Sequence, residues 1–174
     1  HLDAPYHAIP DGRTIDEIPL AQLCGNAMKL RIPGNRNADR PLDADDFAAY
    51  PEKETIEKLV LETGWAQETW GTSEYFTEGP FLTRAAAEEL ATWPKLHMIA
   101  MDFPNIDSKT ETVMGKPNPN HVIILGKGIV LLENLLRLEE CPDRFFLSSP
   151  PPKLVGGDGC PCRAVAMFPS PFPE

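Results

Sequence analysis

Short apolar runs that alternate with polar segments are the feature of this sequence that most limits its fold. Residues 27–32, 58–63, 96–102 and 129–135 each have the length of one β-strand and are rich in aliphatic side chains. Strands that are buried on both faces of a parallel sheet have this nearly continuous apolar pattern. Thr83 is a suitable N-cap for an alanine-rich amphipathic helix over residues 84–92. The alternation of short strands and short helices predicts one layered α/β domain over residues 1–174.

Other segments predict smaller elements. One or two helical turns are expected over residues 19–23. A short helix is expected over residues 43–50, whose acidic residues cluster at the positive end of the helix dipole. A last strand is expected over residues 163–168, within a stretch that is rich in proline from Cys141 onward. His97 stands inside an apolar run, which favours a packed core histidine over a metal ligand.

The segment from Ala66 to Pro80 is predicted to be a long loop rich in aromatic residues. Long loops inside compact domains often form lids or pocket walls. Trp65, Trp70 and Phe81 are therefore candidates for the wall of a pocket, and core packing is the alternative for each.

The first seven residues, His-Leu-Asp-Ala-Pro-Tyr-His, carry the densest group of chemically active side chains. In an extended segment residues 1 and 3 project to the same side, so His1 and Asp3 can grip one ion together. An imidazole nitrogen and a carboxylate oxygen are ordinary ligands of zinc or manganese. Pro5 stiffens the path of the chain and delivers His7 from a fixed turn. The alternative is a frayed terminus with incidental histidines.

A second informative stretch runs from His121 to Leu135. Two apolar runs flank Gly-Lys-Gly, and the second of them predicts a strand with Glu133 at or just beyond its end. A chain that folds back at the glycines brings His121 close to Glu133. A buried glutamate needs a partner, whereas surface exposure of both residues is the alternative.

Composition excludes some classes of function. The formal net charge of −10 argues against binding to a phosphate backbone, which needs clustered lysine and arginine. No apolar run reaches the length of a membrane span, and no signal-peptide pattern is present. We therefore expect a cytoplasmic protein with neither a nucleic acid nor a membrane as partner.

Four cysteines are present, at positions 24, 141, 160 and 162. Cys160 and Cys162 are separated by one residue, whereas zinc knuckles and thioredoxin-like sites have two. Free thiols in a reducing cytosol are the preferred interpretation. A thiol site at Cys160 and Cys162 remains an alternative.

The order of several motifs resembles the cyclase family of metal-dependent hydrolases, which includes bacterial kynurenine formamidases and isatin hydrolases. The family hallmark reads H-x-G-T-H-x-D-x-P-x-H, and residues 1–7 match it from the second His onward. Residues 102–107 match the family's D-x-P-S-I-D, and residues 158–164 match its D-G-S-P-x-R-A. Further matches are Asp11-Gly12, Leu20, Gly25, Thr63-Gly64-Trp65, His121 and Glu133-Asn134-Leu135.

The resemblance implies a swivelling β/β/α domain and a homodimer or homotetramer. It implies that His1 and Asp3 bind a first divalent metal, Zn or Mn. His121 and Glu133 would complete a second metal position that Asp3 bridges, and His7 would be the acid/base residue or an extra ligand. The implied reaction is hydrolysis of a small amide, lactam or lactone, because a divalent ion lowers the pKa of water from near 16 toward roughly 7.

Two departures from the family pattern matter. The upstream His-x-Gly-Thr of the hallmark is absent and the chain lacks an initiator Met, so we expect a fragment without its N-terminal strands. The first metal position then lacks one ligand, and a non-catalytic metal-binding or interaction domain with an incomplete site is the alternative function. In addition, Asn105 stands where the family often has Ser.

Overall fold

A mixed β-sheet forms the centre of the molecule. The computed structural model describes residues 1–110 and 118–169. In this part of the chain the sheet has eight strands in the order β7-β1-β5-β4-β3-β2-β6-β8. Neighbours among β2, β3, β4 and β5 are parallel, and the outer strands pair antiparallel. The strands are β1 (Leu2–Asp3), β2 (Cys24–Arg31), β3 (Lys58–Glu62), β4 (Met98–Met101), β5 (Val130–Leu132), β6 (Arg144–Ser148), β7 (Gly159–Cys160) and β8 (Val165–Met167).

The central strands divide the interior into two apolar clusters, because successive side chains point to opposite faces. In β4, Ile99 and Met101 belong to the cluster beneath the helices, and Met98 and Ala100 belong to the cluster on the opposite face. All four side chains are fully buried. This two-sided burial explains the continuous apolar runs in the sequence, and the predicted α/β class is confirmed.

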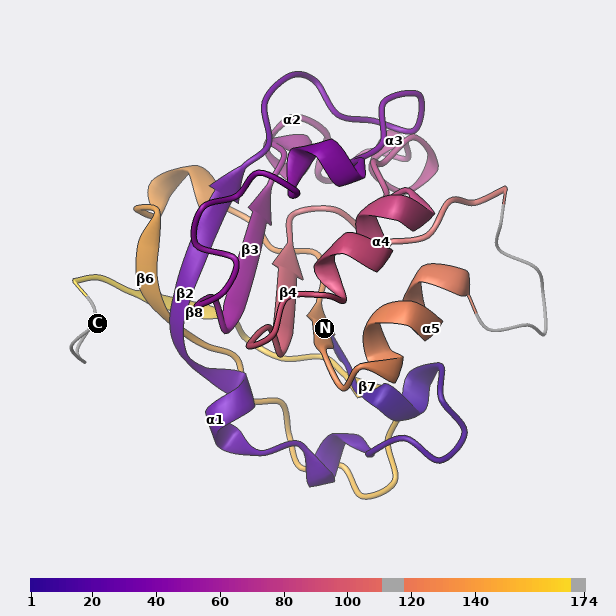
Figure 1. Cartoon of the computed structure of the whole chain (residues 1–174), viewed down its shortest axis with the longest axis vertical. Helices are drawn as coiled ribbons and strands as arrows, with labels where there is room; N and C mark the ends of the chain where they lie inside the picture. The colour runs from indigo at the N-terminus through magenta and orange to yellow at the C-terminus, as the bar shows by residue number, and fades with distance from the viewer. Residues whose placement is uncertain (111–117, 170–174) are drawn as a thin grey trace.

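Two helices cover the same face of the sheet. Figure 1 shows α4 and α5 side by side in front of the central strands. Thr83 caps α4 as predicted, since its hydroxyl accepts a hydrogen bond from the Ala86 amide at 3.2 Å. The helices are α1 (Leu20–Leu23), α2 (Trp65–Thr69), α3 (Glu74–Thr77), α4 (Arg84–Leu90) and α5 (Pro119–Gly126), and the 3₁₀ turns are η1 (Pro5–His7), η2 (Ile15–Glu17), η3 (Ala44–Asp46) and η4 (Leu138–Glu140).

Two predicted segments differ in the structure. The helix expected over residues 43–50 is only the 3₁₀ turn η3. A capping box of Asp43 and Asp46 holds its start, and it ends at Phe47, whose φ of −121° does not continue a helix and whose side chain is fully buried in the core. The loop expected over residues 66–80 contains most of α2 and all of α3. They are joined by a hydrogen bond from the Trp65 ring nitrogen to the Tyr75 carbonyl oxygen at 3.0 Å.

His97 is half-buried, so the prediction of a packed core histidine is only partly right. Its side chain is 30% exposed, and Nε2 lies 3.6 Å from Glu57 Oε2. His97 is partly exposed because it directly precedes the N-terminal end of β4, which begins at Met98. No helix within residues 1–110 and 118–169 is long and apolar enough to cross a membrane.

Candidate active site

Strand β1 places the N-terminal residues against the end of β5. Leu2 pairs with Leu132 of β5 and with Cys160 of β7. Beyond this ladder the Glu133 amide donates a hydrogen bond to the His1 carbonyl oxygen at 3.0 Å. The predicted extended segment is therefore present, and it lies beside Glu133, which directly follows β5 as predicted.

One glycine makes room for the Asp3 carboxylate. A Cβ atom on Gly159 would lie 3.0 Å from both Asp3 Oδ1 and the Leu2 carbonyl oxygen. A larger residue at this position would press on the carboxylate. The neighbouring strand β7 thus leaves the space that Asp3 needs in order to face the cluster.

His1, Asp3 and Glu133 form one group of potential metal ligands. His1 Nε2 lies 3.5 Å from Asp3 Oδ1 and 3.5 Å from Glu133 Oε2. Ligand atoms of the three residues all lie within 4.8 Å of one another. The two carboxylates are almost fully buried, whereas the His1 side chain is 38% exposed. The group therefore opens to solvent on the histidine side.

Asp3, His7 and His121 form a second group within the same 4.8 Å limit. His7 ends the turn η1, in which Pro5 takes the first position, and its Nδ1 lies 4.0 Å from Asp3 Oδ1. His121 Nε2 lies 3.8 Å from Asp3 Oδ2 and 3.7 Å from Glu133 Oε1. The structure brings all five predicted site residues together. Glu133 lies close to both His1 and His121, and the pairing of His121 with Glu133 that the resemblance implies stays a prediction.

Helix α5 presents His121 through a contact with Asp107. The Asp107 carboxylate accepts hydrogen bonds from the Asn120 amide at 2.7 Å and the His121 amide at 3.1 Å. The same carboxylate lies 2.5 Å from His121 Nδ1. Because a carboxylate only accepts, the proton of a neutral His121 ring stays on Nδ1, and Nε2 is free to bind a cation.

The pKa directions reveal an excess of negative charge at the centre of the cluster. Burial and the neighbouring Asp3 carboxylate raise the pKa of Glu133. Burial also opposes ionisation of Asp3, but hydrogen bonds from His1 and His121 outweigh it and hold the pKa of Asp3 below its usual range. Burial lowers the pKa of His121, yet the contacts with Asp107 and Asp3 raise it to about 9.

The donor set fits a divalent cation. Glu133 Oε1 is buried and accepts no hydrogen bond from the described residues. An unpartnered carboxylate oxygen of this kind is costly unless a positive charge compensates it. Imidazole nitrogens with carboxylate oxygens are a ligand set that zinc and manganese accept.

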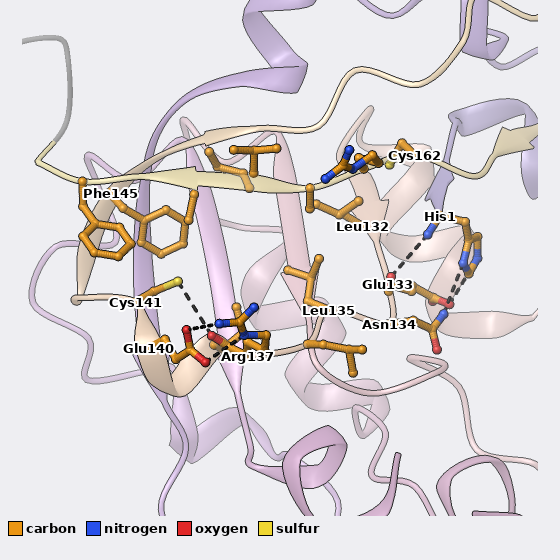
Figure 2. Close-up of a pocket in the computed structure, with 18 residues that line it drawn as sticks. His1, Leu132, Glu133, Asn134, Leu135, Arg137, Glu140, Cys141, Phe145 and Cys162 are labelled. Carbon is orange, nitrogen blue, oxygen red and sulfur yellow. Dashed lines mark hydrogen bonds and ion pairs between the residues drawn. The ribbon is translucent and has the colours of Figure 1, made fainter. Parts of the chain in front are cut away.

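A cavity of about 490 Å³ opens beside His1 and Glu133. Figure 2 shows these two residues and Asn134 at one end of it, with Cys141 and Phe145 toward the other. Its lining includes the apolar side chains of Leu132, Leu135 and Phe145. The cavity is large enough for a small molecule that reaches the cluster.

None of the three aromatic residues expected in a pocket wall lines the cavity beside His1. Trp65 is buried in the core, and Trp70 is 51% exposed and contacts the Tyr75 ring edge-on. Phe81 lines a separate cavity of about 500 Å³ that also contacts Asp107. These positions could not be assigned from the loop sequence because two short helices fix them.

No role was predicted for Asp107, Asp158 and Asn134, which contact the cluster, or for Tyr75, which contacts Asn134. Asp107 and Asp158 lie inside the family motifs of residues 102–107 and 158–164. Their place in these motifs could have indicated a role beside the predicted metal ligands. Asp158 Oδ2 lies 3.3 Å from His7 Nδ1. Asn134 and Tyr75 reach His1 through side-chain contacts that no spacing in the sequence reveals.

The cysteines do not form a disulfide, as expected. Cys160 is buried in the apolar cluster beside β1, and burial raises the pKa of Cys162 to about 11. A high pKa keeps the thiol protonated near neutral pH and makes it a poor nucleophile. Asn105, at the position of the family's Ser, accepts a hydrogen bond from the Asp107 amide at 2.7 Å through Oδ1.

A family model described as Putative cyclase matches residues 1–108, which is more than half of the chain. The chain belongs to this putative cyclase family. The match contains His1, Asp3 and His7, while His121 and Glu133 lie beyond it.

Individual relatives agree with the family. A kynurenine formamidase from Salinibacter ruber is 28% identical over 167 residues, which cover 95% of this chain and 73% of that protein. The solved structure of a potential metal-dependent hydrolase with cyclase activity has a TM-score of 0.73 and 26% identity, covering 95% of this chain and 75% of the other. Isatin hydrolase A from Ralstonia solanacearum has the same fold, with a TM-score of 0.78 and 23% identity over 95% of this chain and 69% of its own.

Proposed function

We propose that this chain is a metal-dependent hydrolase that cleaves the C–N bond of a small amide at the cluster of His1, Asp3, His7, His121 and Glu133. The observation that carries the proposal is the convergence of these side chains around a buried, unpartnered carboxylate oxygen of Glu133. The relatives named kynurenine formamidase and metal-dependent hydrolase support the same class of reaction. A lactam or lactone is a related substrate.

The two ligand groups would hold Zn or Mn. His1, Asp3 and Glu133 offer one position, and Asp3, His7 and His121 offer the other. Asp3 is common to both groups, with Oδ1 toward His1 and Oδ2 toward His121. A divalent cation held there supplies acidification of a water molecule and polarisation of a carbonyl oxygen, which are the two needs of amide hydrolysis.

His7 is the proposed acid/base residue when a cation occupies the group of His1, Asp3 and Glu133, and it is an extra ligand when the second group is filled. Its side chain is 37% exposed at the rim of the cluster, and Asp158 contacts its Nδ1. With Nδ1–H turned toward Asp158, the Nε2 lone pair takes a proton from the attacking water and later returns it to the leaving nitrogen. The apolar cavity beside His1 suits the hydrocarbon part of such a substrate. The cytoplasmic location and the homodimer or homotetramer stay predictions.

Metal content and turnover measured on the same samples test the proposal. The full chain, loaded with Zn or Mn, is assayed against a panel of N-formylated aromatic amines, lactams and lactones. We expect near-stoichiometric metal and hydrolysis in the wild type, loss of hydrolysis in His121→Ala, and loss of both in Asp3→Ala, because Asp3 belongs to both ligand groups. His97→Ala, which removes a histidine outside the cluster, is the control.

Two outcomes would contradict the proposal. Bound metal with no hydrolysis of any substrate would indicate the non-catalytic metal-binding domain instead. Equal metal content in Asp3→Ala and wild type would place the metal elsewhere.

A further inference from the structure

A short path of side-chain contacts leads from the protein core to His1. The Tyr75 hydroxyl donates a hydrogen bond to Asn134 Oδ1 at 2.9 Å. Asn134 Nδ2 lies 3.2 Å from His1 Nδ1. The other ring nitrogen of His1 faces the carboxylates of Asp3 and Glu133. Figure 2 shows Asn134 beside His1 and directly after Glu133.

The surroundings fix both residues of this path. Asn134 has φ of 63°, in the left-handed region that asparagine tolerates better than most residues. Tyr75 is fully buried, and the rings of Trp70 and Phe76 pack against its ring at centroid distances of 5.0 and 4.9 Å. Its hydroxyl is thus held in one place.

A neutral His1 ring carries one proton, on Nδ1 or on Nε2, and its position limits how His1 and Asn134 can form a hydrogen bond. With Asn134 Nδ2 as donor, His1 Nδ1 must carry a lone pair, and the proton of a neutral ring then sits on Nε2, between the two carboxylates. A cation bound to His1 Nε2 requires the lone pair on that atom instead. The ring proton then lies on Nδ1, where it would face the amide NH₂ group, and two donors cannot bond each other.

A half turn of the Asn134 amide removes this conflict. After the turn, Oδ1 accepts the hydrogen bond from His1 Nδ1–H, and Nδ2 donates to the Tyr75 hydroxyl oxygen. The hydroxyl serves in both orientations because it can donate or accept. Asp107 at His121 differs, since a carboxylate accepts in every orientation and needs no such turn.

We propose that Asn134 is a positioning residue for His1 and that its amide turns over when the cluster takes up a cation, with Tyr75 bonding the amide in both orientations. The inference rests on the proposed metal site. In this inference Asn134 and Tyr75 favour the His1 tautomer that carries its proton on Nδ1 and binds a cation through Nε2. Hydrogen-bond partners of metal-bound histidines commonly have this role.

NMR spectroscopy on the ¹⁵N-labelled full chain, with and without Zn²⁺, tests the turn directly. We expect zinc to give a His1 ring with a protonated Nδ1 and a coordinated Nε2. Contacts of the Asn134 NH₂ protons should shift from the His1 ring to the Tyr75 ring. Zinc binding that leaves the Asn134 NH₂ next to His1 would overturn the inference.

Zinc affinities of matched variants, measured by competition with a chelator, give a second test. Asn134→Gly and Asn134→Asp both tolerate the positive φ, but only Asp keeps an acceptor for His1 Nδ1–H. We expect Asn134→Gly to weaken zinc binding about 10- to 100-fold, and Asn134→Asp to bind at least as tightly as the wild type. Tyr75→Phe should lie between Asn134→Gly and the wild type.

The result separates this inference from the proposed function. Zinc binding that requires Asp3 but is equal in Asn134→Gly and wild type would overturn the inference alone. Absence of zinc binding in the wild type would overturn both. A merely structural role of Asn134 would lower the unfolding free energy of the metal-free Gly variant without changing its zinc affinity, and that outcome also contradicts the inference.

Discussion

Two buried glutamates, Glu62 and Glu133, have the same carboxylate group in opposite electrostatic environments. Glu62 ends β3 and is 5% exposed, and Glu133 directly follows β5 and is 4% exposed. Lys29 Nζ and Arg31 Nη2 lie 2.8 and 2.7 Å from the Glu62 oxygens. Glu133 instead lies near His1 and His121, at 3.5 and 3.7 Å, and near the negative Asp3.

The pKa values follow this difference. Burial opposes ionisation of Glu62, but hydrogen bonds from Arg31 and Lys29 outweigh it and lower its pKa. Burial and Asp3 raise the pKa of Glu133. Glu62 thus has permanent cationic partners and stabilises the fold, whereas Glu133 has no such partner among the described residues, in keeping with its proposed role as a metal ligand.

The largest effect expected from this contrast is on turnover. Glu133→Gln removes the charge at nearly constant shape, so we expect metal-dependent amide hydrolysis to fall to background. The matched change Glu62→Gln should keep turnover per folded molecule. Steady-state kinetics on both variants checks this, and a Glu133→Gln protein with full activity would erase the distinction between the two glutamates.

The next largest effect is on stability. Lys29 Nζ also donates to the carbonyl oxygens of Leu138 and Cys141, at 2.9 and 2.7 Å. Lys29→Met removes a buried partner of Glu62 and leaves these acceptors unpaired, so we expect a loss of about 3 kcal/mol in unfolding free energy. Denaturant titration of the metal-free protein measures it. A loss below 1 kcal/mol would mean that Arg31 and water replace the lysine.

A smaller effect is expected at the residue that orients His121. Asp107→Asn keeps the shape but replaces one accepting oxygen with a donor, so the ring can adopt the tautomer that blocks Nε2. We expect metal affinity to fall about 10- to 100-fold, measured by chelator competition. Asp158→Asn, at the rim, is the control and should change the affinity less. Equal losses in both would show that overall charge decides affinity.

The smallest effect is on the pH dependence of stability. The folded pKa of Glu62 lies below its ordinary value of 4.5, so its ionisation stabilises the fold above that pH. This contribution is lost as the pH falls below 4.5 through the folded pKa. We expect unfolding free energy to decline more steeply with acid in the wild type than in Glu62→Gln. Parallel declines would show that Glu62 is not the residue that couples folding to protons.

Local sequence pattern predicted the centre of the fold, and the family motifs singled out the five side chains that the structure brings together. Strands β3 and β4 follow from continuous apolar runs, and the end of β5 correctly places Glu133. Helix α5 could not be assigned, because its apolar run is short and its first turn is held by Asp107, which is distant in sequence. Strand β6 was missed in the proline-rich segment, and its pairing with β2 over residues 144–148 stabilises it.

The contacts around the ligands were harder to foresee. The meeting of His1 with Asn134 depends on a positive φ at Asn134 and on Tyr75, which α3 carries into the core. Neither feature leaves a periodic pattern. Residue type and order therefore predicted which side chains lie together in the cluster, while their hydrogen-bond partners needed the three-dimensional structure.

Anomalous diffraction from crystals of the full chain grown with Zn²⁺ tests the central claim most directly. The account predicts an anomalous peak within about 2.0–2.2 Å of a carboxylate oxygen of Asp3, with further ligands from His1 and Glu133 or from His7 and His121. The peak should be absent in Glu133→Gln if the ion occupies the first group. Zinc located away from Asp3, or no ordered zinc at all, would contradict the account.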